Sequence, residues 1–426
     1  MFVYRLCDLP ADPVFPADLE KLGYFVTEND QIRMISNPEE TFLYKINRNE
    51  RWNELQREAM NGMSKHLTMH AQEEFNSLCT PECIRRIVLD RLHKLGLETW
   101  RLPLSASPHE AHVPILVSNN LPTASRIIVI FGEPSQDLGI WAYRTVGADS
   151  IDAGSVVGLA RAALNKNTAF VLANTGQLIW HCSSGRAVAQ QTWLSLPRSS
   201  ACAGQPTMSY RNKIPGNIDW HEHVNYVFDH VLAPRVWCKG TEPRIDVIGV
   251  SEGGLAAFQY MKANWVKWRT HISAMSLAEP LHSSYDLEED DLTNPAAFAA
   301  FISSRCRGYV LSDKPVGDRV AGYRDLGCNC YSSGEALNAE CIMPMAWRHM
   351  LNWLDLTHAD RNYAEQVMIL ASDIENATRE KLEELDALEE EADHVLEAGG
   401  IMEEKNVELG APMLGLDEMA ALDLDA

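Results

Sequence analysis

The chain has 426 residues, of which 46% are hydrophobic and 23% charged, and its net charge is −22. This composition allows a large hydrophobic core and excludes global disorder. The acidic balance, without clusters of Lys and Arg, excludes the basic surface that direct nucleic-acid binding needs. No stretch reaches the roughly 18–20 uncharged apolar residues of a membrane span, so no membrane association is expected.

The first 25 residues, which include Asp8 and Asp12, lack the basic and apolar regions of a secretory signal. We therefore expect an intracellular protein, in the nucleus, the cytoplasm or both. Its ten cysteines are then expected to be reduced structural thiols. The spacing of Cys328, Cys330 and Cys341 does not match the paired spacings of structural zinc sites, so neither a metal nor another cofactor is expected.

Residues 1–98 predict an N-terminal extension made of a β-hairpin and helices. Short strand-like runs alternate with turn signals over 15–50, whereas 51–78 and 81–95 are rich in helix formers. His66 and His70 have the i, i+4 spacing of metal ligands. No acidic metalloprotease motif accompanies them, so surface or core histidines are the better interpretation.

Residues 99–370 alternate apolar runs with helical patterns. Strands are expected at 99–104, 112–118, 126–132, 168–174, 244–250, 271–279 and 306–313, and helices at 152–164, 219–233, 253–267, 294–304 and 344–356. Apolar runs buried on both faces are typical of a doubly wound, mostly parallel sheet, here of the α/β-hydrolase type. The polar stretch 181–215 predicts an excursion over the carboxyl ends of the strands, where sites of such sheets lie.

Residues 371–426 predict an acidic tail, helical in its first part. From Asp373 to Ala426 there are 18 Asp and Glu against three Lys and Arg, so this segment supplies −15 of the net charge. The pattern favours a solvated, partly disordered tail. The alternative is an acidic–hydrophobic docking segment that becomes ordered on a basic protein partner.

Ser251 occupies the centre of a G-x-S-x-G motif that follows the apolar run 244–250 and precedes a helical pattern. This is the nucleophile elbow of α/β-hydrolases. Gly249 and Gly253 would let strand and helix pass closely. The backbone N–H of Glu252 and the loop at Gly132–Glu133 are the expected oxyanion donors, although the Glu133 carboxylate brings negative charge to that place.

The acid and the base of a catalytic triad follow the serine in chain order. Asp313, which ends a predicted strand, is the first candidate acid and Glu279 the second. The base is expected in the loop 326–347, which contains no histidine. His349 lies inside the predicted final helix and His358 at its end, and these two remain as candidates.

Five segments of the chain together resemble the argonaute-binding protein 2 domain family. They read LGYFVTENDQIRMISNPEETFLYKINRNER, IIVIFGEPSQDLGIWAYR, VLANTGQLIW, DVIGVSEGG and GYVLSDKPVG, and they span roughly residues 15–370. The resemblance implies an α/β-hydrolase-like fold, with Ser251 and Asp313 at the serine and acid positions. It also implies a histidine just before the final helix, where this chain has Ala339 and Glu340.

The same resemblance implies a role in gene silencing. One founding member belongs to a fungal argonaute–small-RNA chaperone complex linked to heterochromatin formation. A related domain follows the catalytic domain of fungal class II histone deacetylases and serves there as an interaction module. The implied partners are therefore argonaute or chromatin-silencing proteins.

Two functions follow from the residues. The favoured one is a non-catalytic, hydrolase-like scaffold that binds proteins of the small-RNA silencing or chromatin machinery. The alternative is an intracellular serine hydrolase acting on an ester or amide through Ser251, Asp313 and His349 or His358. A third, weaker hypothesis is a pocket that binds a small molecule without turnover, lined by aromatic residues such as Trp141, Tyr143, Trp180 and Trp193.

Overall fold

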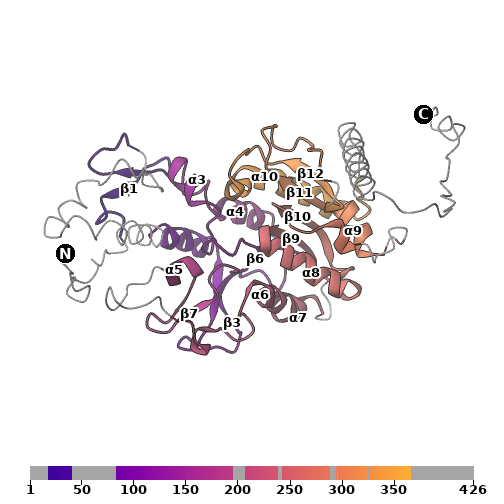
Figure 1. Ribbon diagram of the computed structural model, residues 1–426, viewed down its shortest axis with the longest axis horizontal. Coiled ribbons are helices and arrows are strands. Elements are labelled where there is room, and N and C mark those ends of the chain that lie inside the picture. The colour runs from indigo at the N-terminus through magenta and orange to yellow at the C-terminus, as the bar shows by residue number, and fades with distance from the viewer. Residues whose placement is uncertain are drawn as a thin grey trace, which may run out of the picture. The chain divides into compact units, whose positions relative to one another are not determined.

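The computed structural model describes residues 18–40, 83–194, 207–237, 242–287, 294, 296–323 and 326–365 (Figure 1). All of them belong to one unit of the chain, Met1–Ile369. The helix expected over 51–78 and the acidic tail 371–426 lie outside the described residues, as do His66 and His70. Within the described ranges no helix is long and apolar enough to cross a membrane.

An eight-stranded sheet forms the centre of this unit. Its strands are β3 (Leu97–Leu102), β4 (Val113–Ser118), β5 (Arg126–Phe131), β6 (Ala169–Leu172), β9 (Arg244–Val250), β10 (Ile272–Ala278), β11 (Cys306–Val310) and β12 (Asn329–Ser332). Their spatial order is β12-β11-β10-β9-β5-β6-β4-β3. β4 is antiparallel to both its neighbours and the other pairs are parallel.

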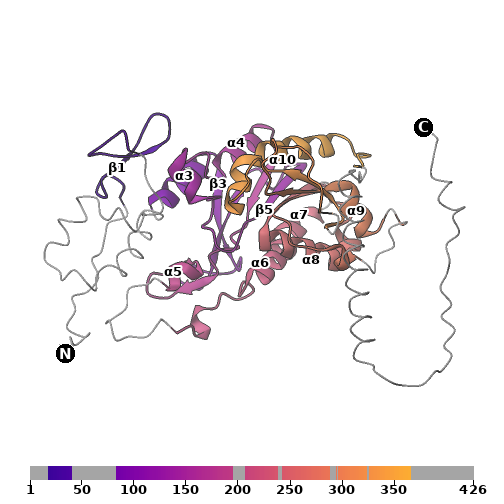
Figure 2. The ribbon, with the colours of Figure 1, turned by 45° about the horizontal axis from the view of Figure 1, so that its top comes forward.

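Helices cover both faces of the sheet (Figures 1 and 2). One face packs on α3 (Tyr143–Ala148), α4 (Val157–Asn165) and α10 (Ile342–Ala359). The other packs on α6 (Trp220–Tyr226), α7 (Ala233–Val236), α8 (Ser251–Trp268) and α9 (Phe298–Arg305). Because β5 and β10 are buried at every position, their apolar runs fit the middle of such a layered core. The predicted α/β-hydrolase-like fold is confirmed.

Three local features differ from the expected elements. β12 falls within a stretch taken as a loop, since four residues of the sequence NCYS give little strand signal. The single helix expected over 219–233 is divided by the π-helix η3 (Val227–Leu232), and α7 follows with Pro234 in its first turn. α10 begins at Ile342, two residues earlier than expected.

An N-terminal hairpin of β1 (Tyr24–Val26) and β2 (Ile32–Met34) is present as predicted. Its turn residue Asp30 has a φ of +65° and accepts hydrogen bonds from the Arg91 guanidinium, one of them at 2.8 Å. The same carboxylate accepts the backbone N–H of Asp152 at 2.8 Å. These bonds fix the hairpin to the helix over 83–94 and to the loop before α4.

The excursion between β6 and α6 holds a second hairpin and two short helical segments. These are β7 (Ile179–His181), β8 (Arg186–Val188), α5 (Gln190–Leu194) and the 3-10 turn η2 (Tyr210–Asn212). Two further 3-10 turns, η4 (Ser284–Leu287) and η6 (Ala339–Cys341), lie in the loops that lead to α9 and α10.

Candidate functional site

Ser251 lies at the turn from β9 into α8 and is 7% exposed. Its φ is +49°, in the left-handed region that costs a non-glycine residue roughly 1–2 kcal/mol. A conformation of this kind persists only where the surrounding structure enforces it. The sequence motif is therefore a true strand–turn–helix elbow.

The glycines of the motif are required by close backbone contacts. A Cβ atom at Gly253 would overlap the carbonyl oxygen of Gly132 and lie 2.9 Å from the carbonyl oxygen of Phe131. A Cβ atom at Gly249 would overlap the Cα of Gly254 and lie 2.9 Å from the Leu277 side chain. The elbow therefore packs backbone against backbone on both sides of Ser251.

The acidic residue that interacts with Ser251 is Glu279, directly after β10. Its backbone also has a positive φ, +50°, and its N–H donates to the Tyr309 carbonyl at 2.9 Å. Burial raises the pKa of Glu279, and the neighbouring carboxylates Glu133 and Glu252 raise it further. A hydrogen bond from Ser251 acts in the opposite direction. Glu279 was the second candidate acid in the sequence.

Asp313, the first candidate acid, lies three residues beyond the end of β11 and is exposed. Its carboxylate makes no hydrogen bond or ion pair with the described part of the chain. The structure thus places Glu279, and not Asp313, beside the elbow serine.

His349 lies in the middle of α10. Its Nδ1 is 2.9 Å from the hydroxyl of Tyr309, and its ring fills the space left by the absent side chain of Gly317. Tyr309 belongs to β11, two strands away from β9, which corresponds to about 10 Å between the strands. The His349 ring is therefore hydrogen-bonded at the outer strands of the sheet and not at the elbow.

His358, near the end of α10, lies at the amino end of strand β9, whereas the elbow lies at its carboxyl end. Its carbonyl accepts a hydrogen bond from Arg244 Nη1 at 2.8 Å. Arg244 begins β9 and Ser251 follows the end of this strand, so about 20 Å of strand separates the two ends. No histidine in the described ranges hydrogen-bonds to Ser251 or Glu279.

Glu340 occupies the place just before α10 where the sequence-based triad needs a histidine. It belongs to the 3-10 turn η6, and its Oε1 accepts from Arg144 Nε at 2.8 Å. This residue was not among the predicted site residues. Its position relative to the final helix was the signal in the sequence that could have identified it.

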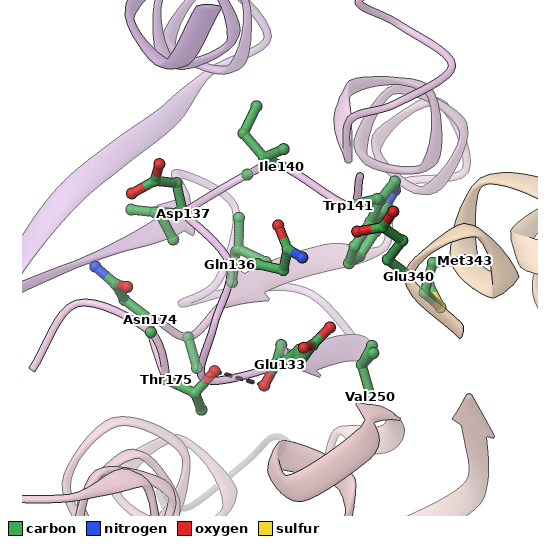
Figure 3. Close-up of a pocket in the computed structure, with 16 residues that line it drawn as sticks. Glu133, Gln136, Asp137, Ile140, Trp141, Asn174, Thr175, Val250, Glu340 and Met343 are labelled. Atoms are coloured by element: carbon green, nitrogen blue, oxygen red, sulfur yellow. Dashed lines mark hydrogen bonds between the residues drawn. The ribbon is translucent and has the colours of Figure 1, made fainter. Parts of the chain in front are cut away.

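A cavity of about 430 Å³, including its open mouth, adjoins the elbow (Figure 3). Glu133 and Glu340 are among the residues that line it, and Val250, which precedes Ser251, forms part of its wall. Its lining consists of Gly132, Glu133, Gln136, Asp137, Leu138, Gly139, Ile140, Trp141, Leu172, Ala173, Asn174, Thr175, Gly176, Val250, Glu340 and Met343. Of the four aromatic residues proposed for such a pocket, Trp141 lines it.

Polar bonds fix the loops around this cavity. Thr175 Oγ1 donates to the carbonyl of Gly132 at 2.5 Å, as the dashed line in Figure 3 shows. Asp137 accepts from Gln177 Nε2 and from the Tyr143 hydroxyl, both at 2.6 Å. Below the loop after β6, buried His223 accepts the backbone N–H of Asn174 at 3.0 Å.

The sequence model of the Arb2 domain matches residues 15–316. The chain belongs to the Arb2 domain family. This confirms the resemblance seen in the sequence and covers both the hairpin and the elbow. No curated protein matches the chain.

Several solved structures are similar to this Arb2 domain. One is a histone deacetylase from Saccharomyces cerevisiae, with 12% identity, a TM-score of 0.38 and coverage of 68% of this chain and 99% of that one. Another is a fungal esterase from Rhizomucor miehei, with 12% identity, a TM-score of 0.30 and coverage of 65% and 90%. A third is an esterase from Pyrobaculum calidifontis, with 13% identity, a TM-score of 0.30 and coverage of 70% and 97%.

The chemistry available at the Arb2 elbow is set by carboxylates. The backbone N–H of Glu252, in the first turn of α8, has no partner within the helix, as an oxyanion donor requires. However, the negative charges of Glu133 and Glu252 are close enough to raise the pKa of Glu279 here. Within the described ranges no three His, Cys, Asp or Glu side chains have an arrangement that could hold a metal ion.

Proposed function

We propose that this Arb2 domain is a hydrolase-like protein without acyl-transfer activity and serves as an interaction scaffold for protein partners. The observation that carries the proposal is the group of side chains at Ser251: Glu279 contacts it, Glu133 and Glu252 lie near, and no described histidine reaches it. A serine nucleophile needs a base of suitable pKa and a site that stabilises a developing oxyanion. Carboxylates at the oxyanion position oppose the second requirement.

Family membership supports a place for this scaffold in gene silencing. We propose that its partners are argonaute or chromatin-silencing proteins, in an argonaute chaperone or in a heterochromatin and histone deacetylase pathway. This implies an intracellular protein in the nucleus, the cytoplasm or both. The charge of the segment 373–426, −15, favours a basic surface on the partner.

A fluorophosphonate probe for activated serines tests the catalytic part of the proposal. The full chain and Ser251→Ala are labelled side by side, with an active serine hydrolase as positive control. We expect no labelling that depends on Ser251, and unchanged recovery of argonaute or chromatin-silencing proteins with Ser251→Ala. Labelling that disappears in Ser251→Ala would overturn the non-catalytic assignment.

A second candidate function is a serine hydrolase in which Glu279 accepts the proton of Ser251. The contact between the two side chains and the raised pKa of Glu279 favour it. In this case Glu279→Gln abolishes labelling as completely as Ser251→Ala does. The triad expected from the sequence, with Asp313 and His349, instead requires that His349→Gln abolishes it.

A further inference from the structure

Three of the free cysteines lie together at the end of the sheet that β11 and β12 form (Figure 1). In the parallel register of these two strands Arg307 pairs with Asn329. One residue earlier, the same register places Cys306 opposite Cys328. Neighbouring strands lie about 4.8 Å apart, and a disulfide needs Cα atoms about 4.4–6.8 Å apart. The backbone therefore accepts a bond between Cys306 and Cys328.

The thiols of this group act on one another. Cys306 and then Cys330 act on Cys328 as hydrogen-bond donors, and they hold the pKa of the Cys328 thiol well below its usual range. Cys330 Sγ also lies 4.0 Å from the carbonyl oxygen of Cys328. Burial, followed by the bond to Cys328, raises the pKa of Cys306. Of the three sulfur atoms, Cys328 Sγ therefore becomes a thiolate most readily, and the thiolate is the reactive form.

His282 supplies a proton acceptor next to this thiol. Its ring is 2% exposed and stacks on Phe258 with 4.3 Å between the ring centroids. Nε2 lies 2.8 Å from the carbonyl oxygen of Leu326, so in the neutral ring Nε2 carries the proton and Nδ1 is the acceptor. Nδ1 has no hydrogen-bond partner in the part of the chain that the structure describes. The ring is close enough to Cys328 to lower the pKa of the thiol further.

The same group is not arranged as a metal centre. Three cysteines and a histidine are donor types of structural zinc sites. Among the residues that the structure describes, however, no three such side chains could hold a metal ion together. Cys328 is 6% exposed, whereas Cys306 is fully buried. A small oxidant therefore meets Cys328 first, and Cys306 is placed to react with Cys328 afterwards.

We propose that Cys328 and Cys306 are a redox-active pair, which a hydroperoxide converts to a disulfide. His282 Nδ1 takes the proton of the Cys328 thiol, and the thiolate attacks one oxygen of the peroxide. An S–O bond forms as the O–O bond breaks, and the leaving oxygen takes the proton back from His282. With hydrogen peroxide the products of this step are water and the Cys328 sulfenic acid. The Cys306 thiol then attacks the sulfenic sulfur, and the S–S bond forms as a second water leaves, so the two thiols lose two electrons to the peroxide.

This pair lies away from the elbow. Cys306 begins β11 and Cys328 directly precedes β12, whereas Ser251 follows the carboxyl end of β9. In intracellular proteins disulfides of this kind are transient and serve in catalysis or redox sensing. The inference goes beyond the proposed function and does not depend on it, so the result of the serine probe leaves it unchanged.

Peptide mapping of the full chain tests the proposal. Reduced protein is treated with hydrogen peroxide, its remaining thiols are blocked, and it is cleaved with trypsin in the absence of reductant. Trypsin releases Cys306–Arg307 as a dipeptide and 325–348 as one peptide that contains Cys328. We expect these two peptides joined by a disulfide in most of the chains, and their separation after reduction. Oxidation that leaves the dipeptide unlinked would overturn the proposal.

Cysteine variants assign the bond. Cys328→Ser should abolish the crosslink, and Cys306→Ser should leave a sulfenic acid at Cys328 that dimedone labels. Cys341→Ser, which removes another buried free thiol from the same tryptic peptide, is the matched control and should leave the crosslink unchanged. A crosslink that survives Cys328→Ser, or that Cys341→Ser removes, would contradict the assignment. Melting curves identify folding defects, and Cys306→Ala carries the same expectation as Cys306→Ser.

The variant His282→Asn tests the base. At pH 7 crosslinking should be slower than in the wild type by at least about tenfold, because proton transfer to a positioned base is lost. Raising the pH toward the ordinary thiol pKa of about 8.5 should restore most of the rate, since hydroxide then removes the proton. A rate equal to that of the wild type, or a loss that high pH does not restore, would refute the role of His282.

Discussion

A substitution of Gly253 by alanine tests whether the elbow is a requirement of the fold, independent of any reaction at Ser251. The new Cβ atom would overlap the carbonyl oxygen of Gly132 and lie 2.9 Å from that of Phe131. Both neighbours are backbone atoms at the end of β5, so neither can turn away as a flexible side chain would. Overpacking of this kind costs about 1–3 kcal/mol and more where the surroundings are rigid.

We therefore expect Gly253→Ala to lower the free energy of unfolding by at least about 3 kcal/mol. At about 2–4 °C per kcal/mol for chains of 150–250 residues, this corresponds to a fall in Tm of roughly 6 °C or more. Gly132→Ala is the matched control, because its Cβ would meet only Thr175 Oγ1 at an ordinary 3.6 Å. Its expected effect lies within about 1 kcal/mol of zero.

Substitutions of the serine complete the test. Ser251→Ala keeps the left-handed backbone and should change stability little. Ser251→Gly releases strain of roughly 1–2 kcal/mol at a φ of +49°, offset by about 0.4–1 kcal/mol of added entropy in the unfolded chain. We expect thermal and urea denaturation to rank the variants Ser251→Gly, Ser251→Ala and then, far below, Gly253→Ala. A Gly253→Ala variant as stable as Gly132→Ala would refute the argument from backbone contact.

Three further predictions concern buried charge and pH. In Asp246→Ala the fully buried carboxylate is removed, and Arg126, whose Nε lies 2.7 Å from it, loses this partner. We expect the free energy of unfolding in urea to fall by about 3–5 kcal/mol, and a fall below about 1 kcal/mol would contradict the pairing. Because the pKa of Glu279 is raised in the folded state, native protein binds more protons above the ordinary value of 4.5, and stability falls as pH rises through the interval between the unfolded and folded pKa values. Glu279→Gln should therefore gain Tm over the wild type at pH 7.5 and show no gain from this source at pH 4. The gain stays below about 1 kcal/mol because the group is partly solvated. Burial lowers the pKa of His223 to about 3, so the folded protein holds this ring neutral. Its contribution to the free energy of unfolding is complete above pH 6.5 and falls as the pH is lowered, by about 3 kcal/mol at pH 4. A His223→Gln variant with the same acid sensitivity as the wild type would exclude this histidine, which holds Asn174, as the cause.

The layered fold could be predicted from the sequence because its signals are local. The strand predicted at 244–250 begins and ends at these residues in the structure, and the glycines around Ser251 indicate the elbow that follows it. β12 could not be predicted in the same way. Its four residues carry little β-propensity, and pairing with β11 across 18 intervening residues holds them in place.

The site could be predicted only in part, because side-chain direction depends on backbone angles that the sequence does not reveal. Asp313 and Glu279 both end a predicted strand, and their sequence neighbours do not reveal which of the two side chains turns toward Ser251. A φ of +50° at Glu279 accompanies its contact with Ser251, whereas Asp313 remains in solvent. The absence of a histidine from 326–347, by contrast, was readable directly, and Glu340 stands at the corresponding place.

The retained elbow and the changed charges have separate physical causes. Gly253 packs on the backbone of Gly132 and Gly249 on that of Gly254, so the strained backbone at Ser251 is maintained by contacts that involve no reacting group. Glu133 and Glu340 bond to other side chains, Ser135 and Arg144, rather than to the packed backbone of the elbow, and each lines a cavity open to solvent. Charge at this site can therefore change without loss of the fold.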